Sequence, residues 1–399
     1  MGSYLETDGI RFPVFVDDKL GMGNTETLEE MNWRMRILEI TKKYKYNNKK
    51  GKTEWMMIRN NRRKNEEKEV ELEVNSGKIG RTTKYKYHGD MYDEKGTNES
   101  KIESKEDKIN LMVNDINRES SEKKVGRAAL SVRLMLTEIV ITPTVLSSTE
   151  TWHNITQHEQ QKITQIHKDI LTKTLQLPRY TPYMGIISEL NILPFVYVIW
   201  YKKLMWYHRI TNSNDERKAK EILFAQMKSS DNWFTELTQF AKESHINIEQ
   251  EFVKSQSYEQ YKRNVKQKIR GRVNAELEQI KRTKTKMRNI SPGKRQQYLD
   301  HCTISEASCI MKLRLNMVHA KANYGGGRCN RCNAEETTEH VLNCETEGEM
   351  KYDYTKMEDV QWLKKINIVY KHFDEQYPIK GLKTNNLAQS LDSSSLNEA

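Results

Sequence analysis

Two adjacent carboxylates near the start of the chain have the residue types and the position of a metal site. Asp17 and Asp18 directly follow the alternating apolar run of residues 10–16. Alternation with a period of two is typical of a β-strand, so we expect both acids in the turn that ends this strand. Neighbouring carboxylates repel each other, and a bound divalent cation or a basic neighbour offsets that repulsion. The pair is therefore a candidate Mg²⁺ site, and the alternative is that both acids only terminate a hairpin.

A second candidate metal site combines cysteine and histidine near the other end of the chain. Two residues separate Cys329 from Cys332, seven separate Cys332 from His340, and three separate His340 from Cys344. Two thiolates from a tight turn and a His and a Cys from the next segment complete the closed tetrahedron that structural Zn²⁺ prefers. Residues 335–339 are expected to begin a short helix that presents His340 and Cys344 one turn apart. The alternatives are a reduced thiol cluster without metal or a redox pair.

The composition favours a polyanionic partner. The 399 residues carry a formal net charge of +11, and 30% of them are charged. Lys and Arg side chains set against phosphates release counterions, so nucleic acid is the first candidate, and a charge that only keeps the protein soluble is the alternative. The longest apolar run, residues 192–201, is too short to span a bilayer, and the N-terminus lacks the layout of a signal peptide. We expect an intracellular protein of the nucleus or cytoplasm that does not contact membranes.

One stretch of the chain concentrates basic residues at helical spacing. Basic side chains interleaved with aromatic rings can follow a phosphate backbone while the rings stack on bases. A run of charges is otherwise a solvated helix face. The candidate nucleic-acid contacts in this stretch are Lys262, Arg263, Lys266, Arg270 and Arg272.

The predicted secondary structure that positions these residues changes near residue 100. Strands and one helix are predicted before it, and helices after it. Before it, a helix over residues 25–42 and strands at 10–16, 55–58, 70–74 and 83–88 predict a small antiparallel sheet with one packed helix. After it, apolar stripes of helical period dominate, and Pro143 is expected to end one helix. The predicted helices cover residues 102–116, 124–142, 157–175, 185–206 and 216–228, with a long helix or a pair over 252–298.

Five sequence motifs in the same order resemble reverse transcriptases, in particular those of non-LTR (LINE-like) retrotransposons. Phe15-Val16-Asp17-Asp18 resembles the aromatic-x-Asp-Asp turn of the family's palm, and Asn48-Lys49-Lys50-Gly51-Lys52-Thr53 looks like its motif D. The segment from Pro143 to Trp152 is similar to a thumb signature, with Ser147-Ser148 in place of Tyr-Gly. The Cys-Cys-His-Cys cluster resembles the family's C-terminal knuckle, with three residues instead of four before the last Cys. Lys86-Tyr87-His88-Gly89 is also similar to the strand near the primer grip.

This resemblance covers residues 10 to about 345 and implies an RNA-directed DNA polymerase. It implies two-metal nucleotidyl transfer at Mg²⁺ held by Asp17 and Asp18, a structural Zn²⁺, and RNA or an RNA–DNA hybrid as partners. It also adds Lys52, Lys86 and Tyr87 to the expected nucleic-acid contacts. The family's other essential carboxylate and its fingers lie upstream of the Asp-Asp turn, so we expect this chain to be a C-terminal portion that does not polymerise by itself. An upstream palm and fingers segment would belong to a longer product. The alternative is a non-catalytic, zinc-dependent RNA- or DNA-binding remnant of a retroelement.

The expected fold is α+β. It consists of an antiparallel palm-remnant sheet with one packed helix, then a mostly α-helical thumb-like region, and a zinc knuckle. The expected divisions are a partial palm over residues 1–99, a helical thumb-like region over 100–215, a basic helical region over 216–320, the knuckle over 321–350, and a C-terminal helix with a disordered tail over 351–399.

Overall fold

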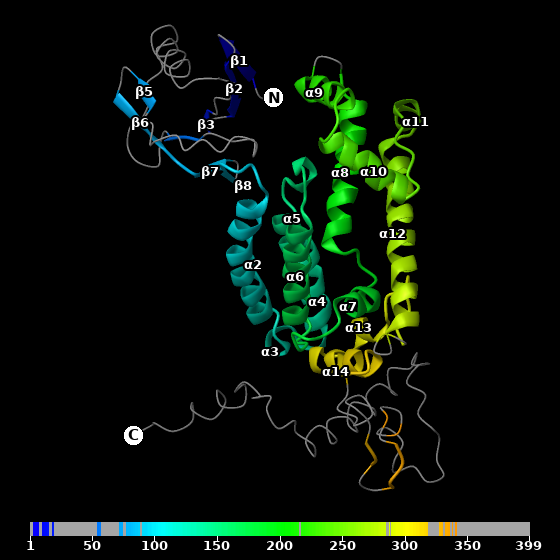
Figure 1. Cartoon of the computed structure of the whole chain (residues 1–399). Helices are drawn as coiled ribbons and strands as arrows, with labels where there is room; N and C mark the ends of the chain where they lie inside the picture. Colours follow the sequence, from blue (N-terminus) through cyan, green and yellow to red (C-terminus); the bar gives the residue numbers. More distant parts are fainter. Residues whose placement is uncertain are drawn as a thin grey trace, which may run out of the picture. The chain divides into compact units, whose positions relative to one another are not determined.

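The computed structural model of the chain divides into two compact units, residues 1–105 and 106–399. It describes residues 3–7, 10–15, 18–19, 54–56, 72–74, 77–87, 90–214, 217–284, 287, 289–317, 327–329, 332–335, 337 and 340. Short strands occur in the first unit, and helices make up most of the second (Figure 1). The expectation of a mainly helical chain with a small amount of antiparallel sheet is confirmed at this coarse level.

The strands of the first unit form small sheets. β1, β2 and β3 pair antiparallel in that order, β4, β6 and β5 form a second sheet, and β7 pairs with β8. The strands are β1 (Ser3–Thr7), β2 (Ile10–Phe15), β3 (Asp18–Lys19), β4 (Glu54–Trp55), β5 (Leu72–Val74), β6 (Gly77–Arg81), β7 (Lys84–Tyr87) and β8 (Asp90–Asp93).

The predicted strands are present, but the predicted single antiparallel sheet is wrong. The described strands belong to three separate sheets, and β4 pairs with β6 in parallel, with Trp55 opposite Arg81. The prediction missed β6 because Gly77 and Gly80 interrupt the apolar alternation that identifies a strand, although its Ile79 is buried. The helix predicted over residues 25–42 lies outside the described residues.

A polar network joins the last hairpin to the start of the following helix, α2 (Glu99–Glu119). The backbone N–H and the hydroxyl of Thr97 donate to the two carboxylate oxygens of Asp93, at 3.1 and 2.9 Å. Lys105 of α2 forms an ion pair with Asp90 of β8 at 3.2 Å, and both side chains are buried. These contacts tie β8 to the first turns of α2.

The helices of the second unit are mostly amphipathic and begin at identifiable caps. Capping boxes at Thr156, Asn232, Ser257 and Thr303 satisfy N-terminal backbone donors of four of them. The α-helices after α2 are α3 (Glu122–Val125), α4 (Ala129–Leu136), α5 (Thr142–Val145), α6 (Gln157–Thr174), α7 (Tyr183–Leu190), α8 (Phe195–Thr211), α9 (Lys218–Met227), α10 (Trp233–Glu243), α11 (Gln250–Ser255), α12 (Tyr258–Thr283), α13 (Tyr298–His301) and α14 (Ile304–Arg314); η1 (Gly126–Ala128), η2 (Thr137–Ile141) and η3 (Thr149–Thr151) are other helical turns.

Pro143 does not end its helix, which corrects the sequence prediction. The helical path continues from α4 through the π-helical turn η2 into α5, where Pro143 occupies the first turn. A proline needs no backbone N–H in the first turn of a helix, and the wider π turn before it shifts the hydrogen-bond register at that point. Pro143 therefore lies just after the change from π-helix to α-helix and does not end the helical path.

The long helix predicted over residues 185–206 is two helices. Asn191 adopts a left-handed conformation with φ of 51° at the end of α7, and Pro194 precedes α8. Asn tolerates this conformation at a helix C-terminus better than most residues, and the chain can then turn sharply. In the stretch predicted over residues 252–298, α12 ends at Thr283 and the described residues from 289 to 297 are not helical.

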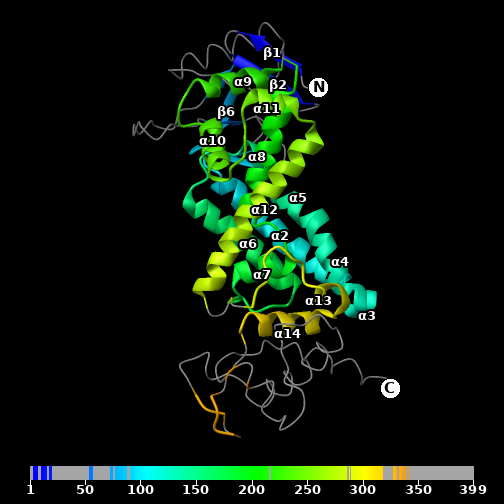
Figure 2. The same cartoon turned by 90° about the vertical axis from the view of Figure 1, so that its right-hand side faces the viewer.

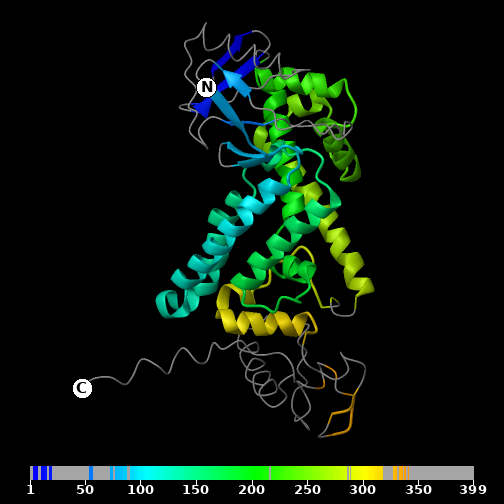
Figure 3. The ribbon, with the colours of Figure 1, turned by 60° about the vertical axis from the view of Figure 1, so that its left-hand side comes forward.

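Two apolar clusters hold the second unit together. One contains side chains of α4, α6, α7, the end of α12, α13 and α14, and the other contains side chains of α8, α9, α10 and the first half of α12. α14 lies across one end of the helices, while α12 runs alongside α8 (Figures 2 and 3). Helices on both sides of the predicted boundary at residues 215 and 216 contribute to both clusters.

Membrane-spanning length was tested on the described helices. None of them is by itself long and apolar enough to cross a bilayer, and α7 with α8 meets the length and composition requirement only as a pair bent by 59°.

Candidate metal centre and basic helix face

A tight hairpin positions the two cysteines of the C-terminal cluster. Arg328 and Glu335 form an antiparallel bridge, and the N–H of Cys329 donates to the carbonyl of Ala334 at 2.8 Å. The N–H of Asn333 donates back to the carbonyl of Cys329 at 2.9 Å, and Asn333 has a φ of 62°. A left-handed residue is needed to close so short a turn, and Asn is one of the few residues that accept it.

His340 approaches the two thiols from the following segment. Its Nε2 lies 3.1 Å from Sγ of Cys332, and its backbone N–H donates to Thr337 Oγ1 at 3.0 Å. The ligand atoms of Cys329, Cys332 and His340 all lie within 4.8 Å of one another, so these three residues could hold a metal ion. Cys344 lies outside the described residues.

The helix predicted over residues 335–339 does not begin at Glu335. This residue closes the hairpin opposite Arg328, and the described His340, whose backbone N–H donates to Thr337 Oγ1, is helical. The local reason is that the cysteine turn needs a partner residue for its bridge before the chain can enter a helix. The prediction that His340 comes from a helical segment is consistent with this arrangement.

Asp18 lies in β3, which pairs antiparallel with β2. Phe15 of β2 pairs with Asp18, and Val14 pairs with Lys19. Asp17 lies outside the described residues, as does Lys52. The catalytic and metal-binding roles of the two acids remain predictions.

A regular apolar stripe fixes which face of α12 is exposed. Tyr261, Val265, Ile269, Val273 and Leu277 recur at every fourth position and are buried. Side chains at the intervening positions therefore point away from the core. This leaves Arg263, Lys266 and Arg270 exposed on the outer surface of the helix.

Four of the predicted nucleic-acid contacts share one face of α12. Lys262, Lys266 and Arg270 are spaced four residues apart, so they lie one above the other, and Arg263 flanks them. Arg263, Lys266 and Arg270 are exposed, and none of the three forms an ion pair with a described residue. Lys262 is paired with Glu259 at 3.3 Å. We call Lys262, Arg263, Lys266 and Arg270 the basic face.

Arg272 forms several contacts with α10, and its role as a nucleic-acid contact remains a prediction. Its Nη2 lies 3.1 Å from Oε2 of Glu243, and its Nη1 donates to Ser244 Oγ at 3.0 Å. Its guanidinium also lies over the ring of Phe240, 5.2 Å from the centroid. Because the helical rotation turns residue 272 toward α10, this half-buried arginine links α12 to that helix.

The remaining predicted contacts belong to the first unit. Lys86 and Tyr87 lie in β7, where the Lys86 side chain is exposed and that of Tyr87 is partly buried. They pair with Met91 and Asp90 of β8. Their role in nucleic-acid binding remains a prediction.

The sequence did not predict a hollow that lies beside α12. Ser188, Asn191, Asn274 and Gly293 contribute to its wall. The Asn191–Pro194 spacing indicates the end of α7. Asn191 and Asn274 are far apart in sequence, so only packing brings them together.

Comparison with known proteins gives no match. No protein-family model matches this sequence, and no curated protein or solved structure is significantly similar to it.

Proposed function

We propose that this chain is a zinc-containing nucleic-acid-binding portion of a reverse transcriptase of the non-LTR retrotransposon type. Its ligand is RNA or an RNA–DNA hybrid, bound by the basic face of α12 together with the cysteine knuckle. The observation that carries the proposal is the convergence of Cys329, Cys332 and His340 on one point.

The donor set of the knuckle supports zinc. Two thiol sulfurs and an imidazole nitrogen are ligands that Zn²⁺ accepts in closed structural sites, whereas Mg²⁺ and Ca²⁺ select oxygen. The sequence offers Cys344 as the fourth ligand. Such an ion stabilises the fold and has no open position for a substrate, so we assign it a structural role.

The charge distribution on α12 supports nucleic-acid binding. Three exposed cations without a described ionic partner lie on one helix face, where each is available to a phosphate. The hydrophobic stripe on the opposite side holds this helix rigidly against α8, so the cations are presented at fixed spacing. This arrangement recognises the backbone and does not by itself read a base sequence.

The Asp17-Asp18 hairpin supports the polymerase relationship more than it supports activity. Two-metal nucleotidyl transfer needs carboxylates that converge from separate strands, and the resemblance assigns only one such strand to this sequence. We therefore expect no primer extension by these 399 residues with Mg²⁺. Extension that is abolished by Asp17→Asn would establish catalysis and overturn this part of the proposal.

Binding to a fluorescent single-stranded RNA of about 12 nucleotides tests the main proposal. Lys266→Ala should weaken binding several-fold and reduce the slope of log affinity against log salt by about 0.7, the value for one phosphate contact on a single strand. Lys124→Ala is the matched control, because Lys124 is a surface lysine that is already paired with Glu119 at 2.8 Å. Equal affinities for Lys266→Ala and wild type at every salt concentration would contradict the proposal.

A metal-dependence experiment separates the two parts of the binding surface. Removal of zinc with a chelator should reduce RNA affinity, and added Zn²⁺ should restore it, while the salt slope from the basic face persists. RNA binding that is unchanged by complete metal removal would exclude the knuckle from the binding surface.

A further inference from the structure

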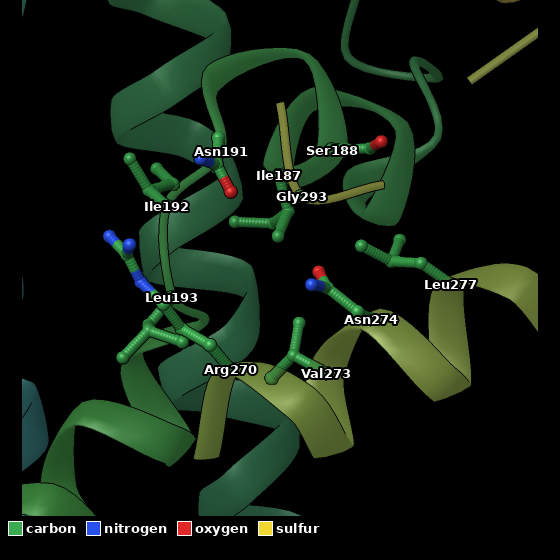
Figure 4. Close-up of a pocket in the computed structure, with 10 residues that line it drawn as sticks. All are labelled: Ile187, Ser188, Asn191, Ile192, Leu193, Arg270, Val273, Asn274, Leu277 and Gly293. Atoms are coloured by element: carbon green, nitrogen blue, oxygen red, sulfur yellow. The ribbon is translucent and has the colours of Figure 1, made fainter. Parts of the chain in front are cut away.

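The hollow beside α12 combines an apolar wall with several polar side chains. Ile187 and Leu277 contribute the apolar side, and Ser188, Asn191 and Asn274 contribute polar groups. Figure 4 shows the carboxamides of Asn191 and Asn274 turned toward the hollow from the end of α7 and from α12. Arg270, a member of the basic face, runs along its rim.

The polar groups of this hollow have hydrogen-bonding capacity that the described residues leave unused. The Ser188 side chain is 1% exposed, and its hydroxyl has no hydrogen-bond partner among the described residues. Neither the Asn191 nor the Asn274 carboxamide forms a hydrogen bond with a described residue. Nine in ten or more of the buried polar groups of folded proteins are paired, so the unpaired Ser188 hydroxyl, which lies beside two half-buried carboxamides, indicates a bound polar species.

Two residues with positive φ build the wall. Asn191, at φ of 51°, turns the chain as α7 ends, and the N–H of Ile192 returns to the carbonyl of Ile187 at 3.3 Å. Gly293 has a φ of 84°, and a Cβ atom there would lie 3.1 Å from Nδ2 of Asn274. Only glycine fits this position without pushing the Asn274 carboxamide out of place.

The size of the hollow and the hydrogen-bond donors around it limit which groups can bind there. The interior admits about one water-sized group, which excludes a whole nucleobase but admits a single oxygen atom of a larger ligand. Carboxamide N–H groups and a guanidinium are donors that suit a phosphate oxygen.

We propose that this hollow binds one non-bridging phosphate oxygen of a nucleic-acid strand that lies along the basic face. Lys262, Lys266 and Arg270 rise about 6 Å from one to the next, a spacing close to that between successive phosphates of a strand. Arg270 neutralises the inserted phosphate at the rim, while Asn191 and Asn274 donate to its oxygen inside. The inference rests on the proposed function, and it adds the position that fixes the register of the strand on α12.

Chemically modified RNA tests the occupant in the full-length chain. A set of oligomers, each with one phosphate replaced by an uncharged methylphosphonate, should contain one that binds wild type about tenfold more weakly. Asn191→Gly should discriminate between that oligomer and unmodified RNA less than wild type does, because the carboxamide contact is already lost in this variant. Asn191→Gly keeps the left-handed turn, since glycine adopts positive φ without strain.

Control variants separate this inference from the proposed function. Gln267→Leu removes an exposed carboxamide from the same helix and should bind all oligomers as wild type does, whereas Asn274→Leu should behave as Asn191→Gly. If Lys266→Ala weakens RNA binding but Asn191→Gly and Asn274→Leu match Gln267→Leu, the hollow holds only a structural water and the inference is wrong while the function stands. The RNA can also carry abasic substitutions. If Asn191→Gly changes the affinity penalty of an abasic substitution but not that of any methylphosphonate, the occupant is a base and the inference is also wrong. If none of the oligomers binds, the proposed function itself fails.

Discussion

Arg314 and Glu189 form a buried ion pair that joins the last described helix to the middle of the second unit. Nε of Arg314 lies 2.8 Å from Oε2 of Glu189, and the two side chains are 4% and 0% exposed. The hydroxyl of Tyr298 donates to the same carboxylate oxygen at 2.9 Å. Burial raises the pKa of the Glu189 carboxyl, and the Arg314 guanidinium opposes that rise.

Loss of one partner of this pair should be far more costly than loss of both. Arg314→Met leaves a carboxylate buried without its counter-ion, and we expect the free energy of unfolding to fall by about 3–5 kcal/mol. The double variant Arg314→Met, Glu189→Met should recover most of that loss, because no charge remains uncompensated. Urea unfolding followed by circular dichroism measures both values. Additive losses in the double variant would show that the pair is not the source of the effect.

The buried His167 predicts a specific loss of stability in mild acid. Burial lowers the pKa of His167 to about 3, while Nδ1 receives hydrogen bonds from the Phe195 N–H and the Tyr183 hydroxyl. The unfolded chain binds a proton below about pH 6.5 and the folded chain does not until about pH 3. This histidine therefore contributes stability above pH 6.5, and about 1.4 kcal/mol of it is lost for each pH unit below that value.

Comparison of two glutamine variants isolates the effect of this histidine. His167→Gln should remove that part of the pH dependence of the free energy of unfolding, while His158→Gln, at an exposed position of the same helix, should keep the wild-type profile. Identical pH profiles for wild type and His167→Gln would contradict the assignment.

Two glycines in helices should respond to alanine with opposite signs. A Cβ atom at Gly185 would lie 2.5 Å from Cδ2 of Leu315 and 3.1 Å from Sδ of Met287, and both side chains are buried. Gly185→Ala should therefore destabilise the chain by overpacking, an effect of about 1–3 kcal/mol. Gly271→Ala meets nothing within 4 Å and should stabilise α12 by about 0.5–1 kcal/mol. Thermal unfolding of both variants checks the signs, and destabilisation by Gly271→Ala would mean that this face of α12 is covered.

Metal analysis should find one zinc ion per chain. Cys329→Ser and His340→Ala each remove a predicted ligand and should lower zinc affinity by at least tenfold. Cys302→Ser is the control, because Cys302 is buried in the helical core and should leave the zinc content unchanged. Stoichiometric zinc in the Cys329→Ser variant would place the ion elsewhere.

The sequence predicts local features of this chain better than its long-range arrangement. The apolar stripe of α12 and the Cys329–Cys332 turn follow from spacing alone, and both are observed. The parallel pairing of Trp55 with Arg81 and the ion pair of Arg272 with Glu243 were not predictable, because each depends on a partner distant in sequence. The effect of Pro143 was predicted wrongly, since the widening of the preceding turn is set by packing and leaves no local signal.

The knuckle has a consequence for how the protein responds to heat. Among the described residues, backbone hydrogen bonds between Cys329 and residues 333–334 and the Arg328–Glu335 bridge close its hairpin, and we expect the proposed ion to supply most of its free energy of folding. Calorimetry should therefore resolve a minor transition whose midpoint depends on zinc concentration, separate from the melting of the helices. Proteolysis at low zinc should accordingly begin in this segment, so the lifetime of the intact knuckle would depend on zinc supply.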